Sequence, residues 1–166
     1  MQPNNNWYVA YTYPKYEKKV DLRMKNMGID SYLPLTEQKR QWSDRVKKIE
    51  APLFPCYLFV RTSAAKVYDL EQINGLMRFV SFDQELATIS ENEINAIKRV
   101  LAHHANARAE DRVYMIGERV RIGQGPLAGM EGMLIRKNSS SRFVIQITTL
   151  NRSIEVDIPT SYLRYC

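Results

Sequence analysis

The sequence predicts an α+β protein, in which strands and helices alternate first and a small β-barrel follows. Short segments with alternating apolar residues recur along the whole chain, whereas three segments in the first 104 residues have helical spacing instead. From residue 113 onward, only strand patterns separated by turns occur. The 166 residues are 45% hydrophobic, which is enough to form a packed core.

The first part of the chain contains four predicted strands and three predicted helices. Proline at residue 14 suits the first turn of a helix, and Gly28 suits its end. Ser90 and Glu93 have the spacing of a capping box, which marks the start of the clearest helix. We expect strands over residues 7–13, 29–35, 51–61 and 77–82, and helices over residues 14–27, 64–72 and 90–101.

A polar arm over residues 36–50 follows the second strand, which Pro34 interrupts. The arm has five basic and three acidic residues around Trp42, and we expect an exposed loop or a long hairpin. Its tryptophan could stack on a nucleic-acid base or pack on the domain below. The residue types leave both alternatives open.

The most apolar segment, residues 51–61, is predicted to be a central strand. Alternation places Leu58 and Val60 on one face with Cys56, and Tyr57 and Phe59 on the other face with Arg61. The second face is either covered by helices of the same chain or exposed to a partner.

The C-terminal part is predicted to be a barrel of five short strands. Residues 117–136 contain a strand, a glycine-bearing turn over residues 123–129, and a second strand that begins at Gly132. Gly132 stands where a small curved sheet can use a residue without Cβ. Small and charged residues precede the barrel, so we expect domains over residues 1–104 and 113–166 with a linker over 105–112.

The composition predicts a cytoplasmic binding protein. A formal net charge of +6 favours polyanionic partners, although basic side chains can also be merely solvated. No apolar run is long enough to span a membrane, and no signal peptide is recognisable at residue 1. Neither the two cysteines, Cys56 and Cys166, nor the adjacent His103 and His104 have a spacing that predicts a disulfide or a metal site. No catalytic motif is present, so we expect no enzymatic activity and no cofactor.

Four segments in order resemble the NusG family of transcription elongation factors. They are WYVAYTYPKYEKKV, PLFPCYLFV, INGLMRFVSF, and GERVRIGQGPLAGMEGMLIR with the closing SIEVDIP; the last resembles the KOW motif. The short length and the QWSDR arm look closer to the specialised RfaH and UpxY types of paralogue. Cys56 stands where the family has glycine, so the strand is expected to lack a bend there.

The resemblance implies an N-terminal α/β domain with an antiparallel sheet, which binds the clamp helices of RNA polymerase, and a C-terminal SH3-like KOW barrel. Two sets of N-terminal contact residues follow by position. The polymerase-binding set is Tyr11, Phe54, Tyr57, Phe59, Ile94 and Ile97. The set that would lie near the non-template DNA strand is Lys19, Arg23, Asn26, Asn74 and Arg78.

The barrel is implied to recruit a second partner, either the termination factor Rho or a small-subunit ribosomal protein. Leu127, Met130 and Leu150 match partner-binding positions of the family, and core packing of the barrel is the alternative role for them. β-branched residues in the final strands favour a permanent barrel over the helical form known for RfaH. We therefore expect a monomeric antitermination factor; the alternative is a KOW-containing RNA-binding or ribosome-associated protein.

Overall fold

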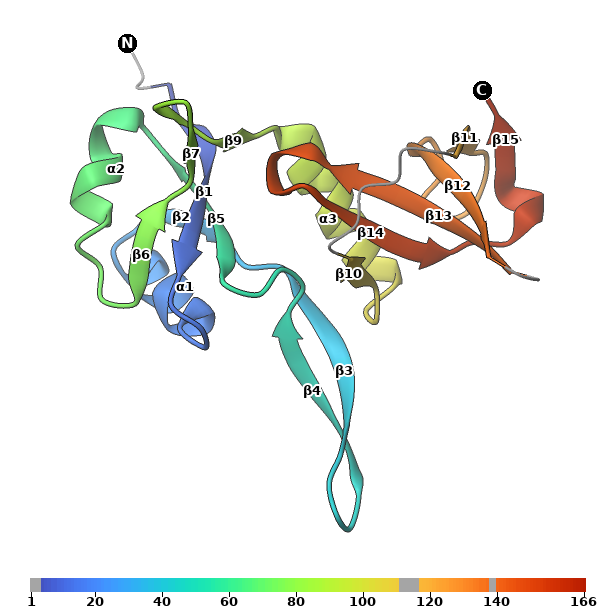
Figure 1. Ribbon diagram of the computed structural model, residues 1–166, viewed down its shortest axis with the longest axis horizontal. Coiled ribbons are helices and arrows are strands. Elements are labelled where there is room, and N and C mark those ends of the chain that lie inside the picture. The colour runs from blue at the N-terminus through green and yellow to red at the C-terminus, as the bar shows by residue number, and fades with distance from the viewer. Residues whose placement is uncertain (1–3, 111–116, 138–139) are drawn as a thin grey trace. The chain divides into compact units, whose positions relative to one another are not determined.

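The protein is described here from a computed structural model, which describes residues 4–110, 117–137 and 140–166 (Figure 1). The predicted α+β fold is confirmed. Internal contacts divide the chain into two compact units. The first consists of Met1–Leu35 and Ala51–Ile94, and the second of Thr36–Glu50 and Asn95–Cys166.

The first unit is built on an antiparallel sheet whose strand order is β2-β5-β1-β6, with β9 also paired to β1. Buried apolar side chains from the sheet and from two helices form one core, which includes Tyr8, Leu58 and Val60. The elements are β1 (Asn6–Thr12), α1 (Glu17–Asn26), β2 (Asp30–Tyr32), β5 (Tyr57–Thr62), α2 (Ala64–Leu70), β6 (Leu76–Phe79), the short pair β7 (Ser81–Phe82) and β8 (Glu85–Leu86), and β9 (Thr88–Ile89).

Helix α1 covers this core with Val20 and Met24, both of which are fully buried. The helix was predicted to begin at residue 14, but it begins at Glu17. Lys15 has a φ of 67°, and the Tyr16 N–H donates to the Tyr13 carbonyl at 3.1 Å, so residues 13–16 form a turn first. The helix ends at Asn26, and the predicted glycine after its C-terminus, Gly28, has a φ of 73°.

The predicted single strand over residues 51–61 is wrong. One strand ends at Pro52 and β5 begins at Tyr57, because Cys56 has a φ of 69° and turns the chain between them. The bend is therefore kept at Cys56, contrary to the expectation that a non-glycine residue would remove it. Left-handed backbone of this kind disfavours any residue with a Cβ, so other contacts have to hold it.

The second unit contains a six-stranded sheet with the order β10-β14-β13-β12-β11-β15. Phe143 and Val120 are fully buried in it. The elements that lie wholly or mostly in the second unit are the hairpin β3 (Leu35–Gln41) and β4 (Val46–Pro52), α3 (Glu91–His103), β10 (Arg108–Glu110), β11 (Glu118–Ile122), β12 (Glu131–Lys137), β13 (Ser140–Ile147), β14 (Arg152–Asp157), β15 (Leu163–Tyr165), and the 3₁₀ turns Thr148–Leu150 and Thr160–Tyr162.

Two features between residues 90 and 112 bear on the predictions. Ser90 and Glu93 form the predicted capping box at α3: the Ser90 N–H donates to the Glu93 carboxylate at 3.0 Å, and the Glu93 N–H donates to Ser90 Oγ at 3.2 Å. In the predicted linker, Arg108–Glu110 forms strand β10 and pairs with β14. Residues 111 and 112 of that linker lie outside the described part of the chain.

Candidate functional site

Three neighbouring strands bring two tyrosines and an arginine into one row. Tyr57 on β5 lies opposite Tyr11 on β1, and Tyr11 lies opposite Arg78 on β6. Opposite residues of an antiparallel pair share a face, so the three side chains project from the same side of the sheet. The two tyrosine rings lie with centroids 5.1 Å apart. We call this set the Tyr57–Tyr11–Arg78 row.

The row is accessible, because both tyrosines are half-buried and Arg78 is exposed. It combines aromatic surface with a positive charge at one end. Aromatic and arginine side chains are the types that contribute most to protein interfaces. The row therefore has the chemistry of a contact surface.

The other four predicted polymerase-binding residues are buried. Phe54 is 1% exposed, and Phe59, Ile94 and Ile97 are 0% exposed. The Phe54 and Phe59 rings meet edge to face at a centroid distance of 6.2 Å. These side chains form packed structure in this conformation, and only Tyr11 and Tyr57 of the six predicted residues are accessible.

Sequence reasoning missed Tyr32, which belongs to the same aromatic group. Its ring stacks on Phe59 at a centroid distance of 6.3 Å, and burial raises the pKa of Tyr32 to about 12. The available sequence signal was the alternation of side chains along residues 30–32. In the structure, Tyr32 lies opposite Phe59 in the β2–β5 pairing, so the two rings share a face.

Glu17, also missed by sequence reasoning, holds the turn that precedes Tyr57. The residue is only 6% exposed, and its carboxylate accepts a hydrogen bond from the Cys56 N–H at 2.9 Å. A second bond, from the Tyr57 N–H to the Phe54 carbonyl at 3.1 Å, closes the same turn. Glu17 thus fixes the point at which the chain enters β5 and hence the placement of Tyr57 in the row.

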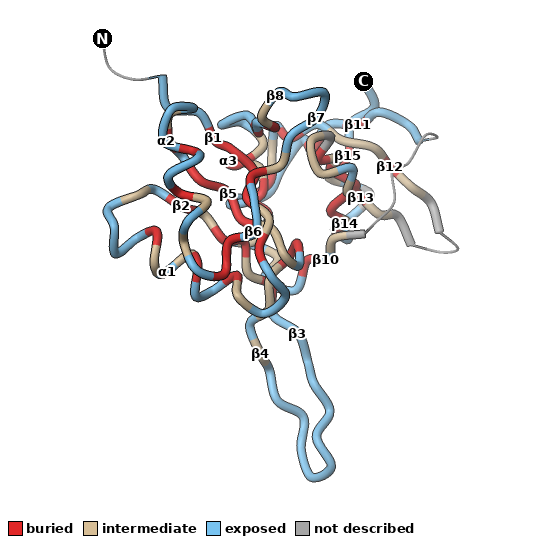
Figure 2. The backbone as a smooth tube through the Cα atoms, turned by 60° about the vertical axis from the view of Figure 1, so that its left-hand side comes forward, coloured by how far each residue is buried: buried red, intermediate tan, exposed pale blue. Residues whose placement is uncertain are grey.

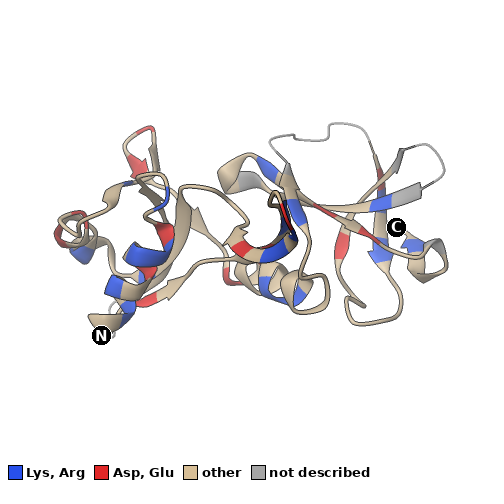
Figure 3. Ribbon diagram, turned by 90° about the horizontal axis from the view of Figure 1, so that it is seen from below, with Lys and Arg blue, Asp and Glu red and all other residues tan. Residues whose placement is uncertain are grey.

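The predicted DNA-binding residues separate into two groups. Lys19, Arg23 and Asn26 lie on α1, where Figure 3 shows basic residues in blue. Arg23 Nη1 donates to the carbonyl of Asn74, which joins the helix to the turn before β6. Arg78 lies apart from α1, at the end of the row.

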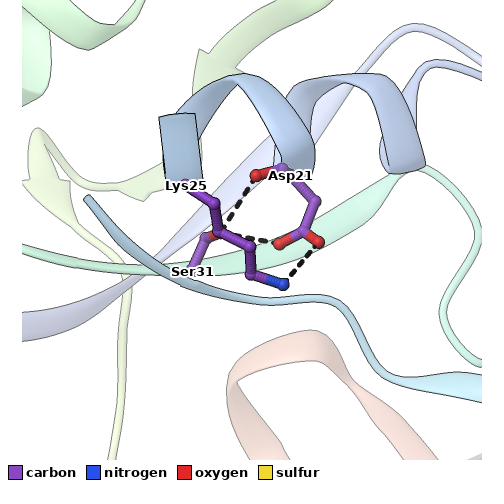
Figure 4. Close-up of polar contacts among 3 residues, drawn as sticks. All are labelled: Asp21, Lys25 and Ser31. Atoms are coloured by element: carbon purple, nitrogen blue, oxygen red, sulfur yellow. Dashed lines mark hydrogen bonds and ion pairs between the residues drawn. The ribbon is translucent and has the colours of Figure 1, made fainter. Parts of the chain in front are cut away.

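Contacts on both sides fix the basic part of α1. Lys19 Nζ lies 5.0 Å from the centroid of the Tyr16 ring, a cation–π geometry. The Asp21 carboxylate accepts from Ser31 Oγ at 2.6 Å and pairs with Lys25 Nζ at 2.7 Å (Figure 4). Because Ser31 belongs to β2, these bonds attach the helix to the sheet.

The sequence left two roles open for Leu127, Met130 and Leu150, namely partner binding or packing in the core of the barrel. Leu127 is 2% exposed and Met130 is 9% exposed, so both pack into the barrel in this structure. Leu150 is half-buried at the end of the 3₁₀ turn Thr148–Leu150. Of the three predicted partner-binding residues, only Leu150 is accessible.

Within residues 4–110, 117–137 and 140–166, no group of three or more His, Cys, Asp or Glu side chains is arranged to hold a metal ion. Among the same residues, none of the helices combines the length and the apolar character needed to cross a bilayer.

Comparisons with known proteins agree with the fold. The family model described as "Transcription termination factor nusG" matches residues 5–98. The transcription termination/antitermination protein NusG of Borreliella burgdorferi is 26% identical over 176 residues, which cover 91% of this chain and 94% of that protein. The protein of the same name from Pseudomonas aeruginosa is 26% identical over 170 residues, which cover 93% and 95%.

A solved structure of Thermotoga maritima NusG, titled "Domain interaction in Thermotoga maritima NusG", superimposes with a TM-score of 0.58 at 18% identity and covers 98% of this chain and 97% of that one. That similarity concerns the fold. The family model, however, matches more than half of the chain. The chain therefore belongs to the NusG family of transcription termination and antitermination factors.

Proposed function

We propose that this protein binds RNA polymerase in the cytoplasm through its aromatic surface and suppresses pausing or termination. The observation that carries the proposal is the Tyr57–Tyr11–Arg78 row in a member of the NusG family. Burial of aromatic rings at an interface supplies about 2 kcal/mol or more for each hot-spot residue. Tyr11 and Tyr57 make the direct contact, whereas Phe54 and Phe59 are buried and pack edge to face against each other.

The positively charged residues add an electrostatic contact with the non-template DNA strand. Lys19 and Asn26 are exposed, and Arg23 is fixed by its bond to the Asn74 carbonyl. Lysine and arginine attract phosphates without reading sequence. Arg78 lies opposite Tyr11 across the β1–β6 pairing, so it adds a separate cation at the end of the Tyr57–Tyr11–Arg78 row.

The barrel is proposed to recruit Rho or a small-subunit ribosomal protein through its loops. Leu150 supplies the accessible apolar side chain, whereas Leu127 and Met130 shape the loop from inside. The arm further favours a specialised paralogue of the RfaH or UpxY type, which acts on chosen operons.

The row offers a direct test with a matched control. Tyr11→Ala with Tyr57→Ala should weaken binding of the full-length protein to purified RNA polymerase by about 30-fold, or about 2 kcal/mol, for each ring that acts as a hot spot. Tyr68→Ala removes a tyrosine that is 71% exposed on α2 and should leave binding unchanged. Phe54→Ala is a poor test, because loss of a buried ring costs about 3–5 kcal/mol of stability by itself.

Transcription through a terminator, with purified polymerase on several leader templates, reads out the activity. The wild type and Tyr68→Ala should increase read-through on at least one template, and the double variant should not. If the wild-type protein neither binds polymerase nor changes read-through on any template, the proposal fails and the RNA-binding or ribosome-associated alternative gains support.

A further inference from the structure

We propose that one face of the β3–β4 hairpin, the arm, binds single-stranded nucleic acid. The arm is a regular hairpin and is exposed along almost its whole length (Figure 2). Trp42 at its tip is 55% exposed, so it does not pack on a domain. Of the two alternatives that the sequence left open for this ring, the structure removes the packed one.

The hydrogen bonding at the tip sets which side chains share a face. The Trp42 N–H donates to the Arg45 carbonyl at 2.7 Å, so these two residues lie opposite each other. Arg40 lies two residues before Trp42, and Lys47 lies two residues after Arg45. Arg40 and Lys47 are therefore opposite each other, on the same face as Trp42 and Arg45. The ion pair of Lys48 with Glu37, at 3.9 Å, lies on the other face and agrees with this register.

The two faces therefore differ in charge. The first presents Trp42 with Arg40, Arg45 and Lys47, and no acidic residue of the strands is on it; we call it the Trp42 face. The opposite face combines Lys39 and Lys48 with Glu37 and Glu50, so its charges cancel. Within the described part of the chain, no ion pair engages Arg40, Arg45 or Lys47.

This combination fits single strands better than duplexes. Cations on one side of an exposed aromatic ring attract phosphates, while the ring stacks on a base of any identity. Successive side chains on the Trp42 face are spaced by about 7 Å along each strand, so several nucleotides can be followed. A base inside a duplex is already stacked and offers no free face to Trp42. The proposal goes beyond the proposed function, because this contact requires no polymerase.

The test measures binding of the full-length protein to labelled oligonucleotides of about 15 nucleotides by fluorescence anisotropy. Trp42→Ala should weaken binding to the single strand by about 10-fold, since stacking contributes a factor of roughly 5 to 150 per base. Arg40→Gln with Lys47→Gln should weaken binding and reduce the slope of log affinity against log salt by about 1.4.

A charge-matched control is available on the opposite face. Lys39→Gln with Lys48→Gln removes the same number of cations from the same hairpin and should have a much smaller effect. Equal losses from the two faces would mean that the arm attracts polyanions without a specific face, and would overturn the proposal. Wild-type affinity in both the Trp42→Ala and the Arg40/Lys47 variants would also overturn it.

Oligo(U), oligo(dT) and a duplex of equal length distinguish the sources of the ligand. Preference for either single strand over the duplex supports the proposal and tells whether RNA or DNA is the ligand. Preference for the duplex contradicts it. Variants of the Trp42 face that keep their oligonucleotide affinity but lose polymerase would instead make the arm a protein contact, and the nucleic-acid proposal would fall.

Discussion

Gly132→Ala should unfold the barrel more easily, because the added methyl group has no space. A Cβ at residue 132 would lie 2.5 Å from the Val144 carbonyl oxygen and 2.6 Å from Cζ of Phe143, whereas ordinary contact begins at 3.4 Å. The carbonyl belongs to β13, which pairs with β12, and the Phe143 ring is fully buried. Neither neighbour can withdraw without breaking sheet pairing or core packing.

The expected cost lies near the upper end of the range for an overpacked core, about 3 kcal/mol. Amide hydrogen exchange in β12 and β13 of the full-length protein measures it, because both tryptophans, Trp7 and Trp42, lie far from the barrel in sequence. A loss of about 3 kcal/mol accelerates exchange by about 100-fold when exchange proceeds through unfolding.

Gly129 provides the control, because glycine is favoured there by the backbone conformation and not by a lack of space for a side chain. Its φ is 86°, but no atom lies within 4 Å of an added Cβ. Gly129→Ala should therefore cost only about 1 kcal/mol, and Gly129→Asn less, since asparagine tolerates left-handed backbone. If Gly132→Ala exchanges at the wild-type rate, or if Gly129→Ala costs more than Gly132→Ala, the packing argument is refuted.

Three further changes test the parts that position the site. Glu17→Ala removes the carboxylate that accepts the Cys56 N–H and should lower the free energy of unfolding by about 2 kcal/mol in urea, with a smaller loss for Glu17→Gln. Ser90→Ala breaks the capping box and should cost about 1 kcal/mol, seen as faster amide exchange in the first turn of α3. Tyr32 is held neutral when folded, because burial raises its pKa from 10.0 to about 12, so its contribution is complete below pH 10 and is lost between pH 10 and 12. Tyr32→Phe should flatten the fall of the urea midpoint in that interval, and an unchanged fall would contradict this account.

Local spacing predicted the features that depend on neighbours in sequence. The capping box at Ser90, the end of α1 at Gly28 and the alternation that places Leu58 and Val60 in the core all follow from residues within one or two turns of each other. The family resemblance gave the order of the two parts, and the family model confirms the family itself.

Distant contacts determined what local spacing could not predict. The bend at Cys56 depends on a carboxylate 39 residues away, and the burial of Phe59 depends on several elements that pack around it. Strand β10 formed within a segment whose composition is typical of linkers, because β14 offered an edge to pair with. The arm is a further example of what local spacing could not predict. Its residue types suggested that Trp42 stacks on a base, but the register of the hairpin was needed to tell which charged residues lie on the same face as Trp42.

The Tyr57–Tyr11–Arg78 row exists only in register, since its members come from three strands that are far apart in sequence. During synthesis, the row cannot be complete until residue 79 has left the ribosome and β6 has paired with β1. A nascent or locally unfolded chain contains the same three side chains, but they do not lie side by side as the Tyr57–Tyr11–Arg78 row. Recognition of the row is thus also a check on folding, because a partner that requires all three residues binds only molecules whose central sheet has formed.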